Sequence, residues 1–169
     1  MSYPAAAIAN QLLDLASQSQ RKLTQIEIQK LVYFSHGWHL ALRDQNLIDD
    51  QIEAWTYGPV VRRLYDVFKK FGSSQITEKA YDWNVSPKGG FAYCFPAIQS
   101  SSLENDTYAR AVVEIVWNKY GLMPPFKLVE ITHLEGSPWQ QAIARGSSTI
   151  QNEDIKTYFK QMTFQGARG

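Results

Sequence analysis

The sequence lacks the cysteine pairs, long apolar runs and excess of positive charge that are typical of secreted, membrane-spanning and nucleic-acid-binding proteins. Its single cysteine, Cys94, cannot form a disulfide within the chain, so a reducing compartment, the cytoplasm, is expected. No apolar run approaches the roughly 18 residues that span a bilayer, and no charged start leads into an apolar signal segment. With 17 Lys and Arg against 16 Asp and Glu, the formal net charge is +1. The molecule as a whole therefore has no long-range attraction for phosphate or anionic lipid, and only a local patch could bind nucleic acid.

The chain also lacks the residue patterns that carry catalysis or hold a cofactor. Its one Gly-Gly pair has no lysine and hydroxyl residue to make a phosphate-binding loop, and no serine lies in a nucleophile elbow. Apolar neighbours around Cys94 raise a thiol's pKa and make it inert. Hydrogen-bonded histidines are favoured over a zinc site for His36, His39 and His133, because no second cysteine or suitable carboxylate pattern accompanies them. The sequence predicts a protein that is not an enzyme and needs no metal or cofactor.

Apolar residues, by contrast, are plentiful. Hydrophobic residues make up 44% and aromatic residues 13% of the chain, which is too rich for disorder and sufficient for a core. One domain is the default at this length, and no repeat or linker divides the sequence. We expect a mainly α-helical fold: a single compact domain at residues 1–164 with a short extended segment or hairpin insert, followed by a frayed tail at 165–169.

Two helices are well marked near the N-terminus. After Pro4, apolar residues recur at helical spacing as far as Ala16. Thr24 and Glu27 have the spacing of a capping box, which predicts a helix that begins at Thr24. Residues after Glu27 are apolar on nearly all sides, so this second helix should be central and buried, and Gly37 should let another backbone come close.

An extended segment should follow, because residues 52–57 alternate before the breaker Gly58-Pro59. Pro59 suits the first position of a helix that ends at Gly72. Residues 76–102 predict a hairpin or an irregular flap.

Helical order returns in the C-terminal part. Further helices should begin at Thr107, Pro124-Pro125 and Ser137, and Asn152 is expected to cap the last one. The residues of the Thr107 helix expected to face the core are Ala111, Val112, Ile115 and Val116, with Tyr120 as a further candidate.

The predicted helix after Pro59 has a basic face, which consists of Arg62, Arg63, Lys69 and Lys70. A solvated helix face, a phosphate contact and a contact with an acidic protein are all compatible with it. Arginine and aromatic residues dominate binding hot spots. The residues nominated to bind a partner are therefore the corner Trp55, Tyr57, Gly58 and Pro59, the arginines Arg62 and Arg63, and the flap aromatics Trp83 and Phe91.

Two long motifs resemble a known family. Residues 23–38 read LTQIEIQKLVYFSHGW and residues 52–61 read IEAWTYGPVV. These resemble the two signatures of the Panacea domain, which is the domain of SocA-like antitoxins and of related phage-associated proteins. Thr132-His133 with Ser137-Pro138-Trp139 resembles a later element of the same family, and residues 155–159 resemble its last helix. The resemblance extends from about Ile8 to Met162, although residues 79–102 match none of these motifs.

The resemblance implies an antitoxin that neutralises a cognate protein toxin by direct contact, and some SocA-like members act as proteolytic adaptors that deliver their toxin to a ClpXP-type protease. Neither role needs a cofactor or a membrane. No appended basic or helix-turn-helix segment is present, so nucleic acid is not an expected partner. The alternative hypothesis is a nucleic-acid-binding regulator that uses the basic helix after Pro59. The motif residues could form either the contact surface or the core, and the sequence leaves both open.

Overall fold

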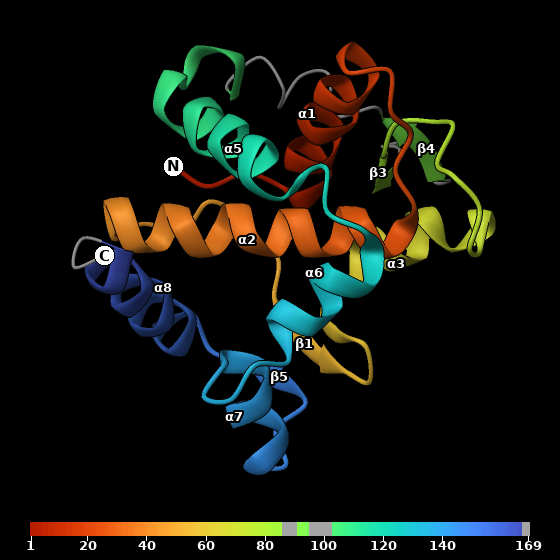
Figure 1. The fold of residues 1–169 in the computed structure, drawn as a ribbon. Helices are drawn as coiled ribbons and strands as arrows, with labels where there is room; N and C mark the ends of the chain where they lie inside the picture. The colour runs from red at the N-terminus through yellow and green to blue at the C-terminus, as the bar shows by residue number, and fades with distance from the viewer. Residues whose placement is uncertain (86–90, 95–102, 167–169) are drawn as a thin grey trace.

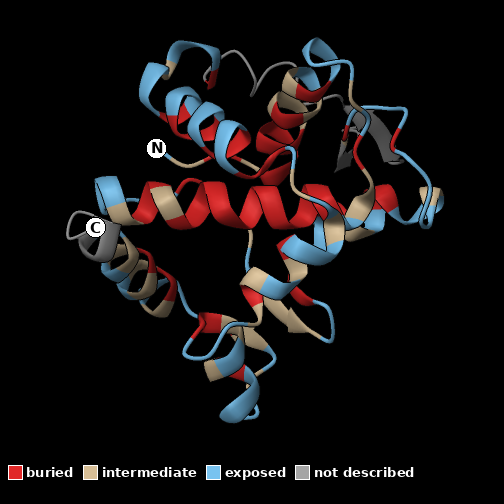
Figure 2. Ribbon diagram, viewed as in Figure 1, coloured by how far each residue is buried: buried red, intermediate tan, exposed pale blue. Residues whose placement is uncertain are grey.

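The structure, a computed structural model, describes residues 1–85, 91–94 and 103–166, and the side chains of 1–81 and 103–163. One helix, α2 (Gln25–Arg43), crosses the middle of the molecule and is buried over most of its length (Figures 1 and 2). Helices α1 (Ala5–Gln18) and α5 (Thr107–Tyr120) pack on one side of α2, and α8 (Asn152–Gly166) packs on the other. The prediction of a mainly helical fold around a buried second helix is confirmed.

The start of α2 also agrees with the prediction. Thr24 is its N-cap, and the Glu27 carboxylate accepts hydrogen bonds from the Thr24 backbone N–H at 3.2 Å and from its hydroxyl at 3.0 Å. Further along the helix, a Cβ added at Gly37 would overlap the ring of Phe159. Glycine at this position therefore allows α8 to pack closely against α2.

The remaining helices and strands surround these four helices. The shorter helical segments are α3 (Arg62–Phe68), η1 (Lys69–Phe71), α6 (Pro125–Thr132) and α7 (Pro138–Ala144). A small antiparallel sheet has the order β2-β1-β5, with β1 at Ile52–Trp55, β2 at Gly58–Val61 and β5 at Thr149–Ile150. A separate hairpin pairs β3 (Asp82–Val85) with β4 (Phe91–Cys94), as the sequence predicted for this region.

Three details of the predicted elements are wrong. Pro59 is not the first residue of a helix: it lies in β2, and α3 begins at Arg62. A proline is tolerated there because β2 is an edge strand, where a missing N–H breaks no ladder bond. Asn152 is the first residue of α8 rather than its cap, since the carbonyl of Gln151 already accepts from Ile155 N.

The third error concerns the face of α5. Its buried residues are Ala109, Val112, Val113, Val116, Trp117 and Tyr120, whereas Ala111 is exposed and the Ile115 side chain is 56% exposed. Val113 and Trp117, two positions further along, face the core in place of Ala111 and Ile115. The prediction was correct for Val112, Val116 and Tyr120.

Candidate functional site

A short hairpin presents the most exposed part of the predicted corner. Strands β1 and β2 pair antiparallel with Trp55 opposite Gly58, so Thr56 and Tyr57 form a two-residue loop. Gly58 has a φ of +106°, which L residues rarely adopt. At the tip of the loop, the Tyr57 side chain is 68% exposed.

Side chains from α2 close the outer edge of β2. The Gln29 amide donates to the Val61 carbonyl at 3.1 Å and accepts from the Val61 N–H at 2.9 Å. The Lys30 ammonium donates to the Pro59 carbonyl at 2.9 Å. Because backbone groups of residues two apart face the same edge of a strand, these bonds replace the missing neighbour of β2. Gln29 and Lys30 of the first motif therefore form hydrogen bonds with the GPVV segment, residues 58–61, of the second motif.

Gly58 packs tightly against this arrangement. A Cβ at Gly58 would lie 2.7 Å from Thr132 Oγ1 and 3.0 Å from Lys30 Nζ. The hairpin, α2 and α6 consequently meet at Gly58, and both its backbone conformation and the space around it require glycine.

The TH and PW residues of the later motif bring α6 and α7 against the hairpin. His133 stacks on Trp139, with ring centroids 3.8 Å apart and an interplanar angle of 9°. The Trp139 indole N–H donates to the Trp55 carbonyl at 2.6 Å. His133 Nε2 is buried and has no hydrogen-bond partner among the described residues. All three motifs thus converge on one junction of α2, β2, α6 and α7.

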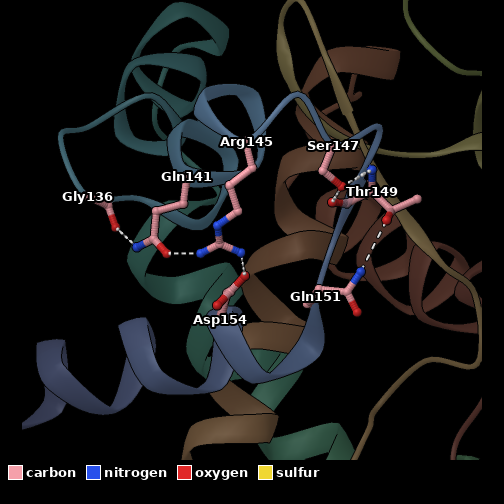
Figure 3. Close-up of polar contacts among 7 residues, drawn as sticks. All are labelled: Gly136, Gln141, Arg145, Ser147, Thr149, Gln151 and Asp154. Carbon is pink, nitrogen blue, oxygen red and sulfur yellow. Dashed lines mark hydrogen bonds and ion pairs between the residues drawn. The ribbon is translucent and has the colours of Figure 1, made fainter.

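Polar contacts fix α7 relative to β5 and α8 (Figure 3). Arg145 pairs with Asp154 at 2.8 Å and donates to the Gln141 side chain at 3.0 Å, and Gln141 donates to the Gly136 carbonyl at 2.8 Å. Near β5, the Ser147 hydroxyl donates to the Thr149 carbonyl at 2.8 Å. The Arg145–Asp154 pair ties the C-terminal end of α7 to α8, and the Trp139 bond to Trp55 ties α7 to the hairpin.

Lys30 is electrostatically unusual. Lys30 is only 2% exposed, and no carboxylate among the described residues forms an ion pair with its ammonium. Burial lowers the pKa of Lys30 from 10.5 to about 7, because an ammonium loses its hydration in the interior. Burial also lowers the pKa of His133, and the positive charge of Lys30 lowers it further. A lysine with such a pKa, beside an unpartnered histidine nitrogen, is typical of functional sites.

A pocket of about 520 Å³ opens between the first turns of α2 and the hairpin. Most of its wall is aromatic, aliphatic or uncharged polar, and Lys30 is the one lining residue that carries an ammonium. The lining residues are Gln25, Ile26, Gln29, Lys30, Ala54, Trp55, Thr56, Tyr57, Val60 and Tyr65. Its size is within the range of small ligand pockets and of pockets that take a partner's side chains.

The rim of the pocket is braced by Glu53. Trp55 Nε1 donates to the Glu53 carboxylate at 2.6 Å, and the Arg62 guanidinium pairs with the same carboxylate at 2.9 Å. The Arg62 guanidinium also lies 5.1 Å from the centre of the Trp55 ring. Burial raises the pKa of Glu53, but the bonds from Arg62 and Trp55 outweigh burial and the net pKa is lowered. The indole ring is therefore held in one orientation at the surface.

The basic face predicted after Pro59 carries much less free charge than the sequence suggested. Each of its four cations lies beside a carboxylate: Arg62 beside Glu53, Arg63 beside Asp50 at 4.0 Å, Lys69 beside Asp66 and Lys70 beside Glu78. Pairing of this kind reduces the local potential that a phosphate backbone would meet.

The nominated residues differ in where they lie. Arg62 and Arg63 have side chains that are 61% and 70% exposed, and Trp55 is partly buried at the rim of the pocket. Gly58 and Pro59 are buried. The side chains of Trp83 and Phe91 lie outside the described residues.

Sequence reasoning missed Gln29, Lys30, His133 and Trp139 as parts of one site. A signal was present, because Gln29 and Lys30 are polar residues on a helix whose other positions are apolar on nearly all sides. The remaining histidines have structural partners. His36 Nε2 bonds to Asn152 Oδ1 at 3.0 Å, its Nδ1 accepts from Leu47 N, and His39 bonds to the Gln45 carbonyl at 2.8 Å.

Two features are absent from the described residues. No group of three or more histidine, cysteine, aspartate or glutamate side chains is arranged there to hold a metal ion. No helix within the described ranges is long and apolar enough to cross a membrane.

Together, the fold and the pocket define a mainly α-helical domain with a small sheet that frames a surface pocket. Residues 28–140 match the family model described as "Antitoxin SocA-like, Panacea domain". The chain is also 32% identical over 148 residues to "Antitoxin SocA" of Caulobacter vibrioides (strain NA1000 / CB15N), an alignment that covers 88% of this chain and 74% of that protein. No solved structure matches the chain significantly. The chain belongs to the SocA-like, Panacea-domain antitoxin family, as the motifs indicated.

Proposed function

We propose that this protein is a non-enzymatic antitoxin that neutralises its toxin by direct binding, and that the pocket beside the hairpin is the centre of the contact surface. The observation that carries the proposal is the pocket of about 520 Å³ with Trp55 and Tyr57 at its rim. Aromatic residues and arginine supply most of the energy at protein interfaces, and such residues work best when they are held rigidly around a concave surface. Family membership supports the antitoxin role.

Within this proposal the nominated residues have two kinds of role. Trp55, Tyr57 and Arg62, with Arg63 further along α3, contact the toxin directly. Gly58 and Pro59 are buried, so they act by shaping the hairpin. Trp83 and Phe91 belong to the separate β3–β4 hairpin, and within this proposal they form a further contact with the toxin.

Delivery of the toxin to a ClpXP-type protease in the cytoplasm is an extension of the same proposal, because an adaptor must first bind its cargo. The nucleic-acid alternative has less support, since the four cations it needs each lie beside a carboxylate. A steep fall in DNA affinity between low and physiological salt would be its signature.

The test is co-expression with the product of the adjacent reading frame, with growth rescue and co-purification scored together. We expect rescue by the wild type and by Phe126→Ala, and loss of both readouts in Tyr57→Ala. Phe126 is a matched control because its side chain is 72% exposed, close to the 68% of Tyr57, and it does not line the pocket. Both variants should keep the wild-type melting temperature, because exposed side chains contribute little to stability.

Rescue that requires the protease and depletes the toxin would identify an adaptor. Stable co-purification without depletion would identify a stoichiometric inhibitor. A neighbour that is harmless alone and does not co-purify with the wild type would contradict the proposed function itself.

A further inference from the structure

Trp55 lies at the rim of the pocket, and the residue directly opposite it in the sheet cannot hold its ring. In the β1–β2 register that residue is Gly58, which has no side chain to pack against the indole. Trp55 is also only partly buried. A tryptophan at such a position would rotate about its side-chain bonds and would lose that freedom only when a partner packs on it.

Glu53 supplies the support that the opposite strand lacks. Residues two apart on a strand face the same side, so Glu53 and Trp55 share a face of β1. The Glu53 carboxylate accepts a hydrogen bond from Trp55 Nε1 at 2.6 Å, and a bond to a carboxylate is stronger than one to a neutral acceptor. The other carboxylate oxygen accepts from Arg62 Nε at 3.1 Å, so Glu53 is itself held in place.

Helix α3 adds two contacts to the indole ring. Arg62 and Tyr65 are three residues apart and therefore share a face of the helix. The Arg62 guanidinium lies 5.1 Å from the centre of the Trp55 ring. The Tyr65 ring meets the Trp55 ring edge-on, with centroids 4.8 Å apart and an interplanar angle of 62°. Glu53 connects the two elements, because it binds both Trp55 of β1 and Arg62 of α3.

We propose that Glu53 is a positioning residue for toxin binding, which does not contact the toxin but presets the Trp55 ring in the orientation that the toxin contacts. This inference rests on the proposed function and adds to it a residue that acts through Trp55. Both oxygens of the Glu53 carboxylate are already bonded within the protein, to Trp55 and Arg62. The rotational freedom of the indole is consequently lost on folding rather than on binding, which favours affinity.

The first measurement needs no toxin. In a two-dimensional proton–nitrogen NMR spectrum of the full chain, the indole signal of Trp55 is assigned by its loss in Trp55→Phe. A charge-assisted hydrogen bond moves an indole proton signal downfield, so this signal should move upfield in Glu53→Gln and in Glu53→Asp. The aspartate keeps the charge, but its side chain is one methylene shorter and does not reach Trp55 Nε1.

The second measurement is the affinity of the full chain for the product of the adjacent reading frame, by calorimetry. Glu53→Gln and Glu53→Asp should each bind about 3- to 10-fold more weakly than the wild type, because the freed indole must be ordered on binding. Asp66→Asn is the matched control, since Asp66 is an exposed carboxylate of α3 that pairs with Lys69 rather than with Trp55. It should change the affinity by no more than about twofold, because exposed ion pairs contribute little.

A double-mutant cycle with Trp55→Phe separates positioning from direct contact. Phenylalanine has no N–H for Glu53 to hold. Adding Glu53→Gln to Trp55→Phe should therefore weaken toxin binding by no more than about twofold, whereas a Glu53 that contacts the toxin itself would show its full effect in either background.

An unchanged indole signal in both Glu53 variants, an unchanged affinity, or an undiminished effect of Glu53→Gln in the Trp55→Phe background would each overturn the inference while leaving the antitoxin function intact. Failure of the wild type to bind would instead contradict the proposed function, and the NMR spectrum would still show whether Glu53 holds the Trp55 ring. If Glu53→Gln does not fold, Glu53→Asp decides all three measurements.

Discussion

The substitution Lys30→Met should reverse its effect on stability as the pH rises. In the unfolded chain Lys30 binds a proton below its ordinary pKa of 10.5, whereas in the folded protein it does so only below about 7. The contribution of Lys30 to the wild-type free energy of unfolding therefore rises with pH between these two values and is lowest at pH 7 and below. The full difference corresponds to about 5 kcal/mol.

Methionine removes the free-energy cost of burying the Lys30 amine, but it leaves the Pro59 carbonyl without its hydrogen-bond donor, which costs about 1 to 3 kcal/mol. At pH 7, where Lys30 is half titrated in the folded protein, the variant should consequently be more stable than the wild type by about 1 to 3 kcal/mol. Near pH 9 the two should be equally stable, and at pH 10 the variant should be the less stable protein.

Urea denaturation of both proteins at pH 7, 8, 9 and 10 measures this difference, with the slope of each transition checked for two-state behaviour. Changes that affect both proteins equally cancel in the difference. A constant difference across the four pH values would refute the reasoning, because Lys30 would then have the same pKa in the folded and unfolded states.

Three further predictions concern the fold. Gly58→Ala should destabilise the protein by about 2 to 4 kcal/mol through backbone strain and overlap with Thr132. The control is Gly146→Ala, because Gly146 has a φ of +69° at the end of α7 but open space around it, and this substitution should cost about 1 kcal/mol in thermal or chemical denaturation. Thr24→Ala should remove about 1 kcal/mol by weakening the cap of α2, and an unchanged unfolding midpoint would contradict the capping role. Burial, partly opposed by the bond to Asn152, lowers the pKa of His36 from 6.5 to about 4. The free energy of unfolding should therefore fall by about 3 kcal/mol as the pH falls from 6.5 to 4, because the unfolded chain binds a proton that the folded protein does not bind. His36→Gln should show a shallower acid slope in the same pH series.

Several features of the fold were readable from local sequence because local physical chemistry decides them. The capping box at Thr24 and Glu27 sets the start of α2 whatever the rest of the chain does. The apolar residues on nearly all sides of that helix require burial on all sides. Gly37 was expected to mark a close approach, although the sequence did not indicate that Phe159 would be the neighbour.

Other features depended on residues distant in sequence. Pro59 suits both the first turn of a helix and an edge strand, and the hydrogen bonds from Gln29 and Lys30 to β2 decide between them. In α5, apolar residues occupy more than one face, so its orientation depends on where α1 and α2 lie. Asn152 can cap a helix, but its amide bonds to His36 instead.

For the candidate site, the sequence determined that the QK, GPVV, TH and PW residues form a recognisable set, and it indicated the family. Only the tertiary structure decided that these residues converge, since a hydrogen bond between Lys30 and Pro59 joins positions that no local pattern relates. The same holds for the charge at the surface. Four cations close in sequence predicted a basic face, but each lies beside a carboxylate, and three of these carboxylates, Glu53, Asp50 and Glu78, come from other segments. Local sequence patterns determine which residues are available. Burial, which lowers the pKa of Lys30, and the pairing of charges arise only when segments distant in sequence pack against each other and exclude water.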